Sequence, residues 1–177
     1  NELLLANYML KNSKNKDEKL AIINHILDLY KATLYRQTMF AEFEKETHKL
    51  REKGEVLTSD LLSNMYYDLV KKYFGPNVLC DDLIRYEWAR IPHFYYNFYV
   101  YKYATGISAA SYIVDGILNN REGALKNYIN FLKTGGSMYP LDELKIAGVD
   151  LNSKSVVLSA IKTFERYLKE FKDIYNS

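Results

Sequence analysis

The chain has 177 residues, 48% of them hydrophobic, which is enough length and apolar surface for a buried core and excludes a disordered polypeptide. Lysine and arginine number 24 against 22 aspartate and glutamate, and the net charge of +2 gives no field strong enough to attract nucleic acid or anionic lipid by itself. No apolar run approaches the roughly 18 residues of a membrane span, and a lone cysteine, Cys80, cannot form an internal disulfide, so we expect a cytoplasmic protein with no membrane partner.

The chain begins at Asn1 and enters a helical apolar pattern at once. A start without methionine or a capping segment indicates the inside of a longer polypeptide, and we expect further sequence upstream. Nearly all of the three prolines and eight glycines stand where a helix can end. This placement of glycine and proline predicts an all-α fold.

Apolar residues recur at spacings of three and four along most of the chain and predict a series of amphipathic helices. In chain order, helices are expected from Asp17 to about Arg51, from a cap at Thr58 or Ser59 to Gly75, from Asp81 to Arg90, from His93 to about Asn119, from Glu122 to Lys133, from Leu141 to Ala147, and from a cap at Asn152 or Ser153 to at least Phe171. There is no internal repeat or long linker. The sequence therefore predicts a helical bundle of two long helices and several shorter ones, forming a single domain over residues 1–177.

The histidine, cysteine and glycine patterns contain no metal or nucleotide motif. The sequence has three histidines, and it lacks a His-Glu-x-x-His motif, a cysteine pair and a glycine-rich phosphate loop. His25 and His48 both lie on the first long helix without a nearby set of ligands, and we interpret them as ordinary helix residues. We therefore expect no metal site in this chain.

The stretch 92–106 combines the third histidine with several tyrosines. At 3.6 residues per turn, one strip of a helix would carry His93, Tyr96, Tyr99 or Val100, and Tyr103. This pattern alone allows two interpretations. The first is an aromatic core helix whose hydroxyls reach the surface. The second is a clamp for a substrate carbonyl, in which preorganised donors stabilise the charge that grows in the transition state.

The residues from Tyr86 to Gly106 closely resemble the carboxy-terminal region of oligoendopeptidase F, a zinc peptidase related to thimet oligopeptidase. Other segments resemble that family in the same order. Asn1-Glu2 is similar to the end of its Glu-x-Ala-Ser-Thr-x-Asn-Glu stretch. The next helix and the closing loops of the family are matched by Arg36 to Glu44, Gly135-Gly136-Ser137, Tyr139-Pro140-Leu141 and Ala147 to Asp150. The resemblance spans nearly the whole chain.

This resemblance implies that the chain is the substrate-binding part of a larger, zincin-type oligopeptidase that hydrolyses short peptides. The family holds zinc with a His-Glu-x-x-His motif and a second glutamate, and all of these residues would lie upstream of Asn1. The chain alone should therefore hold no zinc and be inactive without the missing amino-terminal part.

The resemblance also implies roles for individual residues. His93 matches the family's substrate-binding histidine, and Tyr103 matches the phenol that donates to the oxyanion. Tyr96 and Tyr99 are implied as their neighbours in the cleft, and which of these tyrosines or Tyr101 contacts the oxyanion stays open. Gly135, Gly136 and Ser137 resemble a flexible loop that borders the substrate, with a simple helix-ending turn as the alternative.

Two other functions stay open at this point. A non-catalytic helical module could bind a peptide or a partner helix through the same tyrosines, and saturable tight binding of short peptides by the chain alone would favour it. Stacking of nucleic-acid bases on tyrosines needs a basic groove as well. The near-neutral charge of the chain opposes that interpretation, and we expect no nucleic-acid partner.

Overall fold

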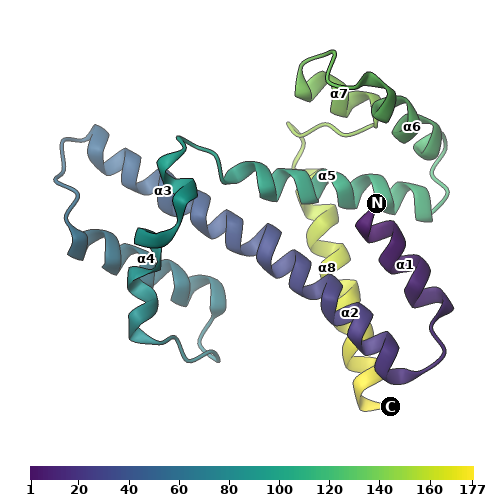
Figure 1. The fold of residues 1–177 in the computed structure, drawn as a ribbon, viewed down its shortest axis with the longest axis horizontal. Helices are drawn as coiled ribbons and strands as arrows, with labels where there is room; N and C mark the ends of the chain where they lie inside the picture. Colours follow the sequence, from purple (N-terminus) through teal and green to yellow (C-terminus); the bar gives the residue numbers. More distant parts are fainter. The chain divides into compact units, whose positions relative to one another are not determined.

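A computed structural model describes residues 1–177, and it is helical with no β-strand (Figure 1). Eight α-helices, one π-helix and two 3-10 helices follow one another along the chain. Their bounds are α1 (Glu2–Asn12), α2 (Lys16–Tyr30), the π-helix η1 (Lys31–Tyr35), α3 (Arg36–Glu52), α4 (Ser59–Phe74), the 3-10 helices η2 (Asp82–Arg90) and η3 (Pro92–Tyr95), α5 (Tyr101–Leu118), α6 (Ala124–Thr134), α7 (Pro140–Ile146) and α8 (Lys154–Asn176).

The chain divides into two compact units. Unit 1 comprises residues 1–31 and 105–177, and unit 2 comprises residues 32–104. Each unit has buried side chains of its own and is described by itself. The all-α fold is confirmed, whereas the expectation of a single domain over residues 1–177 stays a prediction.

Most of the expected helices are present. Helical residues run without a break from Lys16 to Glu52, close to the predicted limits, although the five residues of η1 form wider π turns that a 3.6-residue period does not predict. Thr58 caps α4 as expected, because its side chain accepts a hydrogen bond from the Leu61 N–H. Gly75 ends that helix with a φ of 77°. Ser153, rather than its neighbour, caps α8.

The predicted helix from His93 to about Asn119 is wrong in its first two turns. Pro92–Tyr95 form the short 3-10 helix η3, and α5 begins only at Tyr101. Between them, Phe98 has a φ of 52°, in the left-handed region that α-helices exclude. The N–H of Phe98 donates to the Glu44 carboxylate instead of a carbonyl one turn earlier. The three-and-four spacing of the aromatic residues therefore does not reflect a continuous helix.

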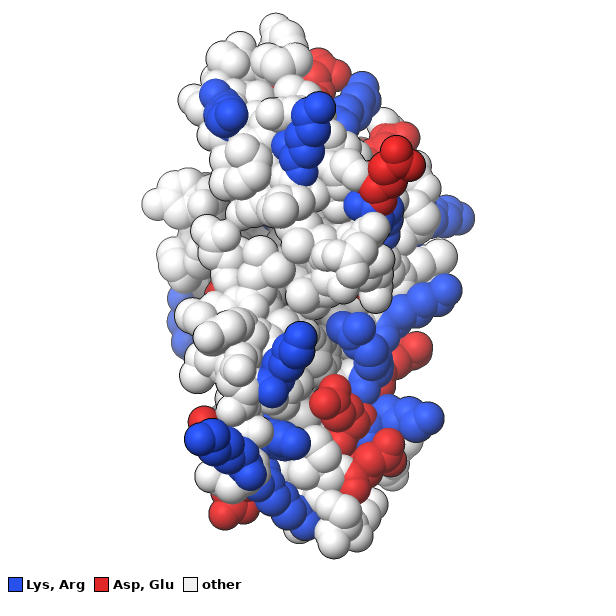
Figure 2. Space-filling view, turned by 90° about the vertical axis from the view of Figure 1, so that its right-hand side faces the viewer, with Lys and Arg blue, Asp and Glu red and all other residues white.

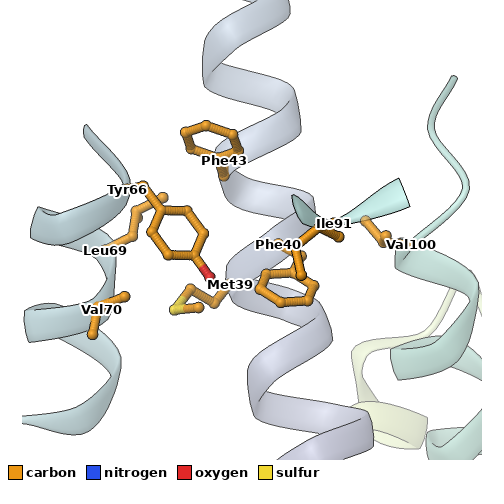
Figure 3. Packing of buried hydrophobic residues seen from close by; sticks show 8 residues of the cluster. All are labelled: Met39, Phe40, Phe43, Tyr66, Leu69, Val70, Ile91 and Val100. Atoms are coloured by element: carbon orange, nitrogen blue, oxygen red, sulfur yellow. The ribbon is translucent and has the colours of Figure 1, made fainter. Parts of the chain in front are cut away.

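The core of unit 2 lies where α3 and α4 pack against each other and where the segment after η2 returns to α3. Figure 3 shows side chains of α4 directed toward α3, with two residues of the returning segment on the other side of that helix. This cluster consists of Met39, Phe40 and Phe43 on α3, Tyr66, Leu69 and Val70 on α4, and Ile91 and Val100. Phe94 packs against this cluster, and its ring and those of Phe40, Phe43 and Tyr66 meet at centroid distances of 5.2 to 6.3 Å, in the range of attractive aromatic pairs.

In unit 1, α2 packs along both α8 and α1, and buried tyrosines join these helices through their hydroxyls. The hydroxyl of Tyr167 on α8 donates to the Asn7 amide oxygen on α1, at 2.6 Å. Tyr30 on α2 is fully buried, and its hydroxyl shares a hydrogen bond with Ser111 on α5. Each buried phenol thus has the partner that its desolvation requires.

Charges of both signs are interspersed on the surface. On the face shown in Figure 2, blue Lys and Arg side chains lie beside red Asp and Glu side chains, with uncharged surface between them. This mixture agrees with the net charge of +2. None of the helices is both long and apolar enough to cross a membrane.

We predict that Phe43→Ala lowers the free energy of unfolding by about 3–5 kcal/mol, because Phe43 is 4% exposed and its removal leaves a cavity beside the rings of Tyr66, Trp88 and Phe94. Urea unfolding followed by circular dichroism measures this change. Phe74→Ala is the matched control, since Phe74 is 38% exposed at the end of α4 and should cost about 1 kcal/mol or less. Equal losses in the two variants would contradict the assignment of Phe43 to the core.

Candidate functional site

Unit 2 brings His93, Tyr99 and Tyr103 together in one half-buried cluster. The Tyr103 hydroxyl and the His93 Nε2 share a hydrogen bond and lie 3.2 Å apart. The Tyr99 ring stacks on the imidazole with centroids 5.5 Å apart, and it meets the Tyr103 ring at 5.7 Å. The Lys102 ammonium lies 3.9 Å from the centroid of the Tyr99 ring, in cation–π geometry. The predicted proximity of His93 and Tyr103 is confirmed, while their chemical roles stay a prediction.

A turn, rather than one helical face, produces this proximity. The Tyr96 N–H donates to the His93 carbonyl and the Tyr99 N–H donates to the Tyr96 carbonyl, at 3.0 and 2.9 Å. Phe98 takes the left-handed conformation inside this turn, which costs a non-glycine residue roughly 1–2 kcal/mol. The chain then enters α5, whose first turn carries Tyr103 back to the imidazole.

The other expected tyrosine lies further out. Tyr96 is 63% exposed, and its ring contacts that of Tyr99 at a centroid distance of 6.0 Å. Tyr101 is exposed on the first turn of α5. Of the tyrosines in this stretch, Tyr99 and Tyr103 are therefore the ones whose rings lie against His93.

The phenol of Tyr103 is protonated at neutral pH. Hydrogen bonding to the neighbouring Tyr99 phenol raises the pKa of Tyr103 above its ordinary value of 10.0, and burial of the hydroxyl raises the pKa further. A protonated phenol is a hydrogen-bond donor. Tyr103 can therefore donate to an oxygen atom that enters the cluster.

A buried ionic group anchors the segment that leads to His93. Glu87, 6% exposed, lies near the end of η2, and its carboxylate accepts hydrogen bonds from Arg36 on α3 at 2.7 Å and from the Tyr66 hydroxyl on α4 at 2.6 Å. Arg90 donates to the same carboxylate. Three elements thus converge on one side chain, which holds the chain just before Pro92.

The remaining expected site residues lie in unit 1. Gly135 and Gly136 follow α6 with φ values of 59° and 82°, a left-handed pair that ends the helix. The Ser137 N–H donates to the Thr134 carbonyl, and all three loop residues are exposed. This geometry is that of a helix-ending turn, and the proposed contact of the loop with substrate stays a prediction.

No group of three or more His, Cys, Asp or Glu side chains that could hold a metal ion occurs in residues 1–177. His25 lies 3.1 Å from Glu2 in an exposed pair, consistent with an ordinary helix residue. His48 lies on α3, and its ring lies 4.5 Å from the Phe98 ring in the turn beside the cluster.

The family model of Peptidase family M3 matches residues 1–163 of the chain. The chain belongs to peptidase family M3. The expected resemblance to oligoendopeptidase F is confirmed by the relatives of the chain within this family.

Two curated M3 relatives match almost the whole chain. It is 50% identical over 174 residues to oligopeptidase PepF of Bacillus subtilis, a match that covers 98% of this chain and 26% of that protein. It is 44% identical over 174 residues to the chromosomal oligoendopeptidase F of Lactococcus lactis subsp. cremoris, covering 98% of this chain and 29% of that protein.

Two solved structures have the same fold. The crystal structure of oligoendopeptidase-F from Enterococcus faecium matches with a TM-score of 0.93 at 45% identity, covering 97% of this chain and 33% of that one. The crystal structure of a putative peptidase from Chlamydophila abortus matches with a TM-score of 0.91 at 45% identity, covering 97% of this chain and 29% of that one. The chain thus spans between 26% and 33% of the length of these M3 relatives, and it is an all-α part of their larger oligopeptidase fold.

Sequence analysis missed three residues that shape this part of the M3 fold: Glu44, His48 and Glu87. A signal was available for Glu44, which follows Phe40 by one helical turn and directly follows Phe43 on the apolar face of α3. A carboxylate at such a position is unusual and indicates a specific partner. Glu87 gave no such signal, because its partners come from distant parts of the sequence.

The anchor at Glu87 predicts a pH-dependent stability. Burial raises the pKa of Glu87, but the hydrogen bonds from Tyr66 and Arg36 and the charges of Arg36 and Arg90 outweigh burial, so the pKa lies below the ordinary value of 4.5. A carboxyl with a depressed pKa stabilises the fold at neutral pH, and this contribution is lost as the pH falls below about 4.5 through the folded-state pKa.

We predict that Glu87→Gln lowers the free energy of unfolding at neutral pH by roughly 1.5–3 kcal/mol, because charge-assisted hydrogen bonds are lost. The difference from the unchanged chain should shrink as the pH falls below about 4.5. Urea unfolding at a series of pH values measures both effects, with Glu52→Gln at an exposed position as the control. A constant difference at all pH values would rule out a carboxylate anchor.

Proposed function

We propose that the longer polypeptide to which this chain belongs is a zinc-dependent metalloendopeptidase that hydrolyses short peptides, and that this chain forms the substrate-binding side of its active site. The observation that carries the proposal is the hydrogen-bonded pair of His93 and Tyr103 in a chain of peptidase family M3. Membership of the family supports peptide hydrolysis. The pair supplies two polar groups suited to a peptide carbonyl.

The chemistry of this pair is transition-state stabilisation. The Tyr103 hydroxyl donates in its protonated form, and the imidazole donates from Nε2 in the tautomer that carries its proton there. When a peptide carbonyl is attacked, negative charge develops on its oxygen. Two preorganised donors aimed at that oxygen lower the barrier more than they strengthen binding of the uncharged substrate. Tyr99 keeps the imidazole in place by stacking on its face.

The zinc that the family implies has no site among these residues, since no suitable group of side chains is present. No step of the proposal therefore depends on a metal held by this chain. We propose that the ligands belong to the other part of the longer polypeptide, which would be the partner of this chain. A cytoplasmic location likewise stays a prediction.

The role of Tyr103 is tested by Tyr103→Phe in the longer polypeptide. Loss of the hydroxyl should lower kcat roughly 100-fold to 1,000-fold with little change in KM, because the missing hydrogen bond forms mainly in the transition state. Steady-state hydrolysis of a short fluorogenic peptide measures both constants. Tyr95→Phe is the matched control, since Tyr95 is 77% exposed and should leave turnover unchanged. Unchanged turnover in Tyr103→Phe would remove this residue from the proposed role.

The assignment of the metal ligands to another part of the polypeptide is tested by metal analysis. We predict that the purified 177-residue chain contains no stoichiometric zinc by plasma mass spectrometry, and that the longer polypeptide prepared in parallel does. The physical reason is the lack of a converging ligand set in the chain. Tightly held zinc in the short chain would show that residues of this chain supply the metal ligands, and it would contradict the assignment.

A further inference from the structure

The turn between His93 and Tyr103 is held from outside by α3. Glu44, only 4% exposed, accepts a hydrogen bond from the Phe98 N–H through its Oε1 at 2.6 Å. One helical turn further along α3, the His48 ring lies 4.5 Å from the Phe98 ring. Two successive turns of one helix therefore hold both the backbone and the side chain of a single residue.

Burial of a carboxylate at position 44 costs desolvation free energy. Glu44 lies one helical turn from Phe40 on the buried face of α3, next to Phe43, where an apolar side chain would be desolvated without loss. The contact that compensates this cost goes to Phe98, which is one of two non-glycine residues with a positive φ. Hydrogen bonds to a carboxylate are stronger than those between neutral groups. Glu44 is thus suited to hold an unfavourable backbone conformation.

The conformation of Phe98 bears directly on the cluster around His93. Phe98 immediately precedes Tyr99, whose ring stacks on the imidazole and contacts the Tyr103 ring. Tyr103 lies five positions after Phe98, and the last three of these positions belong to the first turn of α5. A displacement of the Phe98 backbone would therefore be passed on to both phenols.

We propose that Glu44 is a positioning residue: its carboxylate holds the turn that keeps Tyr103 against His93. The catalytic consequence of this inference rests on the proposed function. The structural consequence, an ordered turn at Phe98, does not rest on the proposed function.

Glu44→Leu in the longer polypeptide is the decisive variant. Leucine fills the buried position, and replacement of a buried charge by a well-packed apolar side chain is often neutral for stability, so the variant separates loss of the acceptor from loss of packing. We expect kcat to fall by about 100-fold with KM little changed, as for a catalytic group displaced by about 1 Å. Glu44→Gln retains a side-chain oxygen within reach of the Phe98 N–H and should recover most of the turnover.

The matched control is Glu42→Leu on the same helix. Glu42 accepts hydrogen bonds from Lys72 and Tyr73, which join α3 to α4 away from the turn. This variant should keep its turnover even where its unfolding temperature falls. All kinetic measurements are made well below the unfolding temperature of each variant.

A double-mutant cycle tests whether Glu44 acts through Tyr103. In a Tyr103→Phe background, Glu44→Leu should cause little further loss of kcat, because the group that it positions is already absent. Independent, additive losses would assign Glu44 a general structural role and overturn the proposal.

Hydrogen exchange gives a readout that does not depend on peptidase activity. Amide exchange measured by mass spectrometry in a peptide covering residues 96–103 should accelerate in Glu44→Leu and stay unchanged in Glu42→Leu. If exchange accelerates while Tyr103→Phe leaves kcat unchanged, the proposed function fails and the holding of the turn stands. If exchange and kcat are both unchanged in Glu44→Leu while Tyr103→Phe lowers kcat, the inference about Glu44 fails and the proposed function stands.

Discussion

The geometry around His93 depends on one hydrogen bond, which the Phe98 N–H donates to the buried carboxylate of Glu44. The left-handed conformation of Phe98 is unfavourable for a phenylalanine. Without the hydrogen bond to Glu44, little would compensate this cost and keep the aromatic stretch after Pro92 from continuing as a helix. With it, the chain makes a tight turn and starts a new helix at Tyr101. The cluster is thus a product of two helices joined by a constrained turn.

A second buried carboxylate complements the first. Glu87 joins η2 to α3 through Arg36 and to α4 through Tyr66, so the segment that enters the turn is also held by a buried carboxylate. Glu44 directly follows Phe43 on α3, and Glu87 accepts a hydrogen bond from Tyr66, so both carboxylates adjoin residues of the core cluster drawn in Figure 3. Charged groups in such surroundings depend on their partners, and this dependence makes the local arrangement specific.

Much of the fold was predictable from the sequence, and the reason is local. Apolar spacing and capping residues such as Thr58 and Ser153 specify helices through contacts within a few residues. The break at Phe98 was not predictable in this way, because it depends on a carboxylate 54 positions away. The site residues His93 and Tyr103 were identified from a family resemblance, and the helical strip first used to bring them together was wrong. A turn achieves the same proximity.

The hydrogen bond between Tyr103 and His93 also determines which acceptor can replace it. Each group already has a partner, so a neutral carbonyl oxygen or a water molecule gains little by separating the two. An oxygen that carries negative charge is a stronger acceptor than either and gains more from both. In the role proposed above, such a hydrogen-bonded pair is therefore better suited to an oxygen that gains negative charge during a reaction than to a neutral acceptor.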